Sequence, residues 1–228
     1  MGPLFEKYRP RTFKDVVGQA EAVKQIRAIL KRQWGGRAYW LAGESGTGKT
    51  SLARIIAHQG AESFFVEEFD SPAALMEAPV QKRIETGMHL YAAGKGGRAF
   101  IINEAHGLRK PEIRWLLGLL ERIPSHVAVL FTTTRESGQL WCDAQTDAAP
   151  LLSRCICIDL ACNSRTLGAF ARAAKRIAQA EGLDGAPASA YQQLAKDCRG
   201  NFRMMLQRIE ARQMVTAKSN RKKSKKGS

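Results

Sequence analysis

The sequence predicts an α/β fold, a five-stranded parallel sheet with helices on both faces, followed by a small three-helix domain. Three observations predict it. Short apolar runs alternate with amphipathic stretches up to about residue 160. A Gly-rich turn, GESGTGKT (43–50), joins an apolar run to a helical pattern. Beyond residue 160 only helical patterns continue, and strands separated by helices form parallel sheets covered on both faces. We therefore divide the chain into an α/β domain (1–160), a helical lid (161–216) and a tail (217–228).

The first half of the α/β domain is expected to supply two strands and the helices around them. The first helix has Val23, Ile26, Ile29 and Leu30 on one face, which is the spacing of a helix that packs on a core. A proline after a serine marks another helix start. In chain order we expect a helix over 20–33, a strand over 38–43, a helix over 49–59, a strand over 63–69, a helix start at 71–72 and a helix over 79–93.

The second half is expected to complete the sheet and then form the lid. One helix begins at Pro111, carries Trp115, Leu116 and Leu119 on one face, and ends at Pro124. We expect strands over 98–103, 126–134 and 155–160, and lid helices over 164–181, 187–198 and 200–215.

The charge indicates a polyanionic partner. The net charge is +15, and residues 218–228 contain six lysines and arginines and no acid, so the rest of the chain keeps +9. A basic surface of this kind suits DNA, although a solvated surface with no partner has the same composition. The tail has no apolar side chain to bury, and we expect it to be disordered.

Composition also limits the compartment. The chain lacks an apolar run of about 18 residues and an apolar signal core at its start, so we expect no membrane span and a cytoplasmic location, nucleoid-associated or nuclear. Five cysteines at irregular spacing fit neither a disulfide framework nor a zinc site, and we expect reduced thiols.

The Gly-rich turn matches G-x-x-x-x-G-K-[ST] between a strand and a helix, which is the context that this motif requires. Its glycines let backbone amides point at phosphate oxygens, and the helix that follows adds its positive end. The lysine can reach the β- and γ-phosphates, and the next hydroxyl can ligate Mg²⁺. The sequence thus predicts ATP and Mg²⁺ as ligands, bound by Gly43, Gly46, Thr47, Gly48, Lys49, Thr50 and Ser51.

The stretch AFIINEAHGL (99–108) ends a strand in Asn103-Glu104, where nucleotide-hydrolysing folds of this type carry Asp-Glu. Asn103 can accept a hydrogen bond from a metal-bound water but offers no negative charge, which weakens the interaction. Glu104 can still orient or deprotonate the attacking water. Two hypotheses stay open: a slow ATPase, or a subunit that holds nucleotide with negligible turnover.

These residues resemble the AAA+ ATPases of the clamp-loader group, such as replication factor C small subunits and the bacterial motor subunit. The resemblance spans residues 4 to about 215. It rests on LFEKYRPRTFKDVVGQ (4–19), TGKTSLARIIA (47–57), WLLGLLERIPSHVAVLFTTT (115–134), LLSRC (151–155) and GNFRMMLQRIE (200–210).

The resemblance implies roles for further residues. Thr134 would be the first sensor of the γ-phosphate, and Arg203 the second sensor on a lid helix. Arg154 would be an arginine finger inserted into a neighbouring subunit's site, so that hydrolysis depends on assembly. The adenine would be bordered by Tyr8, Arg9, Val17 and Gly18.

The resemblance also implies DNA, other AAA+ subunits and a sliding clamp as partners in DNA replication. The sequence holds no residues for the helical collar of clamp loaders, so we expect assembly through AAA+ contacts, DNA or another subunit. The stretch 135–150 is longer than the family pattern needs. Alternatives are a DNA-directed AAA+ motor or helicase loader, and a non-hydrolysing scaffold that donates Arg154. Candidate DNA contacts are Lys82, Arg83, Lys95, Arg98, Arg109, Lys110 and Arg114.

Overall fold

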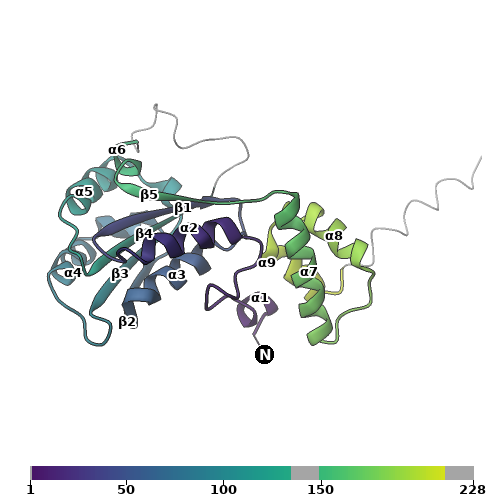
Figure 1. Cartoon of the computed structure of the whole chain (residues 1–228). Helices are drawn as coiled ribbons and strands as arrows, with labels where there is room; N and C mark the ends of the chain where they lie inside the picture. The colour runs from purple at the N-terminus through teal and green to yellow at the C-terminus, as the bar shows by residue number, and fades with distance from the viewer. Residues whose placement is uncertain (1, 135–148, 214–228) are drawn as a thin grey trace, which may run out of the picture.

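A computed structural model describes residues 2–134 and 149–213. Five parallel strands form one sheet in the order β2-β3-β4-β1-β5, with helices on both faces (Figure 1). The α/β fold predicted from the sequence is thereby confirmed. The strands are β1 (Arg37–Gly43), β2 (Ala61–Phe69), β3 (Gly97–Ile102), β4 (Val127–Thr134) and β5 (Cys155–Leu160).

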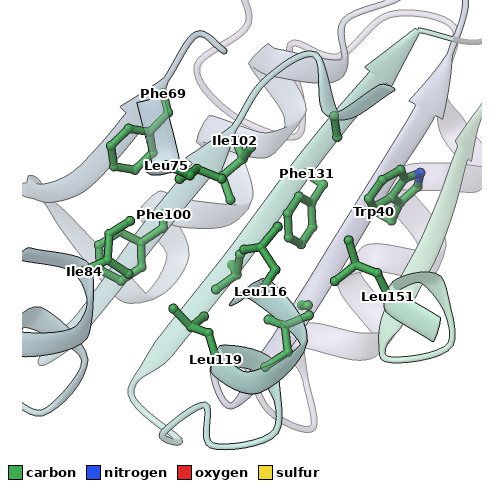
Figure 2. Close-up of a cluster of buried hydrophobic side chains, with 14 of the residues drawn as sticks. Trp40, Phe69, Leu75, Ile84, Phe100, Ile102, Leu116, Leu119, Phe131 and Leu151 are labelled. Atoms are coloured by element: carbon green, nitrogen blue, oxygen red, sulfur yellow. The ribbon is translucent and has the colours of Figure 1, made fainter. Parts of the chain in front are cut away.

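Both faces of the sheet are buried, which explains the unbroken apolar runs of its central strands. Along β1, Tyr39 and Leu41 point into one hydrophobic cluster, with α2 (Ala20–Leu30) and α3 (Lys49–Gly60). Trp40 points into the other cluster, where its ring lies 5.2 Å from that of Phe131 (Figure 2). That second face is covered by η1 (Pro72–Met76), α4 (Ala78–Met88), α5 (Lys110–Leu120) and α6 (Ala149–Leu152).

The last three helices pack in a third hydrophobic cluster together with the start of the chain. Phe170, Tyr191 and Met205 are buried there, and so is Leu4 from the N-terminal helix. In Figure 1 these four helices lie together to one side of the sheet. They are α1 (Leu4–Lys7), α7 (Ser164–Ala180), α8 (Ala188–Asp197) and α9 (Phe202–Glu210). The division of the chain at residue 160 stays a prediction, and the basic tail and most of 135–150 lie outside the described residues.

Some element ends differ from the expectation. Helix α4 ends at Met88 rather than near residue 93, and Leu90 and Tyr91 are exposed. Gly94 and Gly96 then adopt positive φ, which turns the chain into β3 before another helical turn can form. Helix α9 is also shorter than expected at both ends, while α1, α6 and η2 (Ala105–Gly107) were not expected. Across the described part of the chain, none of the helices is both long and apolar enough to span a bilayer.

Candidate functional site

A cavity of about 580 Å³ lies between the phosphate loop (residues 43–50), the N-terminal segment and helices α7 and α9. Parallel sheets bind ligands at the carboxyl ends of their strands, and the phosphate loop follows the end of β1. The structure brings many of the predicted site residues together here. Those that line the cavity are Tyr8, Arg9, Val17, Gly46, Thr47, Gly48, Lys49, Thr50, Ser51, Glu104, Thr134 and Arg203.

The phosphate loop has the geometry of an anion-binding turn. Gly46 and Gly48 adopt φ of +73° and +102°, and α3 starts directly after them at Lys49. The Lys49 ammonium donates to the carbonyl oxygens of Gly43 (3.0 Å) and Glu44 (2.9 Å). Thr47 Oγ1 also donates to Glu44 O, at 2.7 Å, which closes the turn.

Lys49 is the best indication that the loop fits a polyphosphate. Its side chain is only 8% exposed, and burial lowers the pKa of its ammonium to about 8. Among the described acidic residues, none forms an ion pair with it. A buried cation without a carboxylate partner is costly, and an anion bound in the cavity would offset that cost.

Asn103 lies behind Thr50 rather than in the wall of the cavity. Its Oδ1 accepts hydrogen bonds from Thr50 Oγ1 (3.2 Å) and Thr132 Oγ1 (2.8 Å). Its Nδ2 donates to Glu68 Oε1 at 2.7 Å, and Glu68 in turn pairs with Arg54. These contacts of Asn103 with Glu68 and Thr132, and through Glu68 with Arg54, were not predicted, because no local spacing in the sequence connects the residues.

Glu104 and Thr134 are placed beside the loop by the ends of β3 and β4. Glu104 follows β3 in the left-handed region, at φ +53° and ψ +42°, an uncommon conformation for a non-glycine residue. Its side chain is 56% exposed, and its Oε2 lies 3.4 Å from His106 Nδ1. Thr134 pairs in register with Gly43, the first residue of the loop. Both residues line the cavity next to the phosphate loop.

Another part of the cavity wall is apolar. Phe5 and Val17 from the N-terminal segment line it together with Phe170 of α7 and Phe202 of α9, and all four belong to the third hydrophobic cluster. At its rim, the Tyr8 hydroxyl and the Lys7 ammonium both donate to Glu181 at the end of α7. An apolar slot with a polar rim suits a nucleobase. The lid aromatics were missed because their helical spacing is also that of core residues. The other wall residues that the prediction missed include Ser45, Ala173, Arg176, Ile177 and Leu206.

Helix α9 is docked directly on the phosphate loop. The Phe202 backbone amide donates to Gly46 O at 3.2 Å. Asn201 caps the helix, accepting from Met204 N at 3.0 Å, and a Cβ on Gly46 would lie only 2.0 Å from its Oδ1. Arg203, on the first turn of α9, lines the cavity and lies 5.7 Å from the Phe5 ring centroid.

Three further residues that were predicted for the site do not line the cavity: Gly43, Gly18 and Arg154. Gly43 is both the last residue of β1 and the first residue of the loop, and Gly18 packs against Phe170 of α7. Arg154 precedes β5, at the end of the sheet away from the loop, where it pairs with Glu121 at 2.8 Å. Leu160, which is opposite Gly43, lies six positions along the strand from Arg154, a distance of about 20 Å. Arg154 therefore does not reach the cavity of its own chain.

The cations predicted to contact DNA differ in whether they interact with other groups of the chain. Arg83 pairs with Glu67, Lys95 donates to His58 O, and Arg98 donates to Leu90 O. These three side chains are already engaged within the chain. Lys82, Arg109 and Arg114 are exposed on or beside α4 and α5, on one face of the sheet, and Lys110 is exposed at the start of α5 with an interaction of its own within the chain.

Fold and site together resemble those of P-loop nucleotide-binding proteins of the AAA+ class. No family model matches the chain. It is 29% identical to DNA polymerase III subunit tau of Salmonella typhimurium over 67% of this chain and 26% of that protein. It is 31% identical to DNA polymerase III subunit gamma/tau of Mycobacterium tuberculosis over 58% of this chain and 27% of that protein.

These relatives confirm the resemblance to AAA+ ATPases of the clamp-loader group. The chain spans about a quarter of the length of the curated relatives that it matches. A solved structure of a RuvB variant from Thermotoga maritima superposes with a TM-score of 0.67 at 24% identity. It covers 89% of this chain and 64% of that one, which shows the AAA+ fold.

Proposed function

We propose that this chain binds ATP with Mg²⁺ and hydrolyses it slowly, as a clamp-loader type AAA+ subunit that acts on DNA within an oligomer. One observation carries the proposal. The buried Lys49 lines one cavity together with Glu104, Thr134 and Arg203, beside a glycine-rich loop that leads into α3. The separate sequence motifs thus converge on one place where a triphosphate fits.

The residues divide the chemistry between them. Lys49 and the loop amides hold the β- and γ-phosphates. Thr50 Oγ1 and Asn103 Oδ1, 3.2 Å apart, would hold Mg²⁺, the first directly and the second through a water. When bound, Mg²⁺ supplies charge neutralisation on the phosphates. Glu104 orients the attacking water and accepts its proton, and Thr134 and Arg203 contact the γ-phosphate.

The distant Arg154 makes hydrolysis depend on assembly. Because it lies at the other end of the sheet, it acts in a neighbouring copy's cavity or not at all. To do so it leaves Glu121, an exposed partner whose loss costs little. A finger supplied by another subunit contributes about 10³-fold or more to phosphoryl transfer.

A hydrolysis assay over a range of protein concentrations tests the proposal. We expect turnover per chain to rise with concentration, and to fall about 100-fold or more in Glu104→Gln with ATP binding retained. Arg154→Ala is expected to show the same loss, and mixing it with Glu104→Gln should restore activity, because each supplies what the other lacks. Concentration-independent turnover that survives Glu104→Gln would reject the mechanism.

A second candidate function is a scaffold that binds nucleotide without hydrolysing it and lends Arg154 to an active neighbour. The neutral Asn103 at the metal site favours it. Intact ATP binding with no turnover, unchanged by Glu104→Gln, would support the scaffold. A DNA-directed motor or helicase loader is distinguished by its substrate: sliding-clamp binding favours the clamp loader, and junction unwinding the motor.

For the DNA contact we propose Lys82, Arg109 and Arg114 on or beside α4 and α5, rather than the cations that are engaged within the chain. Lys82 and Arg83 are adjacent on α4, but only Arg83 has an ion-pair partner among the described residues. Lys82→Ala should therefore weaken binding to duplex DNA a few-fold and reduce the slope of log K against log salt by about 0.9, while Arg83→Ala does less. Equal effects of the two substitutions would reject this placement.

A further inference from the structure

We propose that Glu68 supplies the negative charge that Asn103 lacks, and that Asn103 and Glu68 form a matched pair in which only one position can carry the charge. Glu68 would be a positioning residue of the metal site, acting through Asn103. The role of the pair at that site rests on the proposed binding of a magnesium nucleotide. The charge relation between the two residues rests on their geometry alone.

The side-chain amide of Asn103 is 7% exposed and has a hydrogen-bond partner at both ends. On one side Oδ1 accepts from two hydroxyls, Thr50 Oγ1 and Thr132 Oγ1. On the other side Nδ2 donates to Glu68 Oε1 at 2.7 Å. Since a carboxylate only accepts, Glu68 fixes which end of the amide faces it. Glu68 thereby directs Oδ1 at Thr50, the hydroxyl proposed to ligate Mg²⁺.

Four of these side chains form a closed circuit. Arg54 donates to Glu68 twice, from Nε at 2.7 Å to Oε2 and from Nη2 at 3.0 Å to Oε1. Thr50 and Arg54 are four residues apart on α3, so they lie on the same face of that helix. The circuit runs from Thr50 through Asn103 and Glu68 to Arg54 and back along α3. It ties the helix after the phosphate loop to β2 and to the end of β3.

The circuit also explains why position 103 is neutral. With an amide at 103, Glu68 is the one carboxylate of the circuit, and it accepts hydrogen bonds from both Arg54 and Asn103. An aspartate there would place a second carboxylate oxygen at hydrogen-bond distance from Glu68 Oε1, with no proton between them. Like charges at such a distance in a part-buried site repel strongly. Asn103 is thus required by Glu68, and the metal site receives its charge from one strand further away, on β2.

An exchange of the two groups tests this pair. In N103D/E68Q the glutamine amide can donate to the new carboxylate, so the net charge and the central hydrogen bond are kept. We expect the Tm of N103D to fall by about 5 °C and the exchange to recover at least half of that loss. E67Q is the matched control: Glu67 is the adjacent acid on β2, but it pairs with the exposed Arg83. It should not rescue N103D.

ADP binding with and without Mg²⁺ gives the second readout, which a purely structural role would not change. The measured quantity is the ADP affinity with Mg²⁺ divided by the ADP affinity without it. This ratio should fall several-fold in E68Q and should not rise in N103D. In N103D/E68Q, where the carboxylate lies next to Thr50, the ratio should rise above the wild-type value. If N103D does not fold, a soluble N103D/E68Q protein would still support the charge relation between the two positions. An insoluble N103D/E68Q protein would contradict it.

Two failures can be told apart. Additive Tm losses in N103D/E68Q, or an N103D protein as stable as wild type, would overturn the pair even if ADP still binds. Absence of ADP binding in all the proteins, with the rescue of Tm preserved, would reject the proposed function and leave the charge relation standing. An E68Q protein with unchanged magnesium dependence would overturn the positioning role.

Discussion

The two ends of the cavity are held together by different forces. The phosphate end consists of a contiguous turn and strand ends, and hydrogen bonds fix its polar groups, such as Lys49 and Asn103. The base end is formed by Phe5, Phe170 and Phe202, which come from three distant segments and are held by apolar packing. The phosphate end is therefore preformed, whereas the base end exists only while α7 and α9 keep their place on the sheet.

This difference between the two ends predicts which contacts determine nucleotide affinity and which couple nucleotide binding to movement of the lid. Contacts at the phosphate end should determine how tightly any nucleotide binds. Contacts at the base end should determine how nucleotide binding moves the lid. The hydrogen bond from Phe202 N to Gly46 O joins the two, because it connects α9 directly to the phosphate loop.

The largest effect is expected from Lys49→Met, which removes the charge but keeps much of the length. ATP affinity should fall about 100-fold or more, since a charge-assisted hydrogen bond contributes about 1.5–3 kcal/mol and Lys49 would make more than one. The free protein should become more stable, because a buried, unpaired ammonium is removed. Calorimetric titration and thermal unfolding measure the two effects. A destabilised variant that still binds ATP would contradict this account of the phosphate end.

A smaller loss is expected from Gly46→Ala, and Gly48→Ala is its matched control. Both glycines have positive φ, so both substitutions strain the turn. Only at Gly46 would the new Cβ meet the lid, at 2.0 Å from Asn201 Oδ1. We expect each to lower ATP affinity about tenfold or more.

Adding Asn201→Gly to each variant separates strain in the turn from the clash between the new Cβ and the lid. Glycine is tolerated as a helix N-cap, so α9 should survive the change. ATP affinity should be partly restored in Gly46→Ala/Asn201→Gly but not in Gly48→Ala/Asn201→Gly. Equal rescue of both would show that the contact between lid and loop is unimportant.

The residues beside the phosphate loop were easier to predict from the sequence than the apolar wall of the cavity, for a physical reason. The loop is one contiguous motif, and strand order placed Glu104 and Thr134 beside it. Glu68 was missed because its hydrogen bond to Asn103 depends on the pairing of β2 with β3, which includes a register shift that the sequence does not display. Phe170 and Phe202 were missed because an aromatic residue at helical spacing looks the same in a core and in a pocket.

A moderate effect is expected from pH. Burial lowers the pKa of Lys49 to about 8, below its ordinary value. Between about pH 8 and 10.5 the unfolded chain therefore binds more protons than the folded one. Below this range the buried ammonium lowers the free energy of unfolding by its full amount. As pH rises through the range, the lysine loses its proton in the folded state and the free energy of unfolding increases. Phosphate binding requires the ammonium form, so ATP affinity should fall about tenfold from pH 7 to pH 9, with proton uptake on binding. Calorimetry in two buffers of different ionisation enthalpy measures the uptake, which should vanish in Lys49→Met.

The smallest effect is expected at the rim of the base end, from Glu181→Gln. Glu181 accepts from Lys7 and Tyr8 and so connects the N-terminal segment to the end of α7, but the Lys7 ammonium that pairs with it is exposed to solvent. Exposed ion pairs are screened by water and salt, so ATP affinity should change no more than about twofold. Fluorescence titration of a labelled nucleotide at low and high salt would measure it. A loss of ATP affinity as large as that expected for Gly46→Ala would mean that the ion pair at the rim, rather than the aromatic packing, holds the lid in place. Polar interactions would then stabilise both ends of the cavity, and the contrast between them would be wrong.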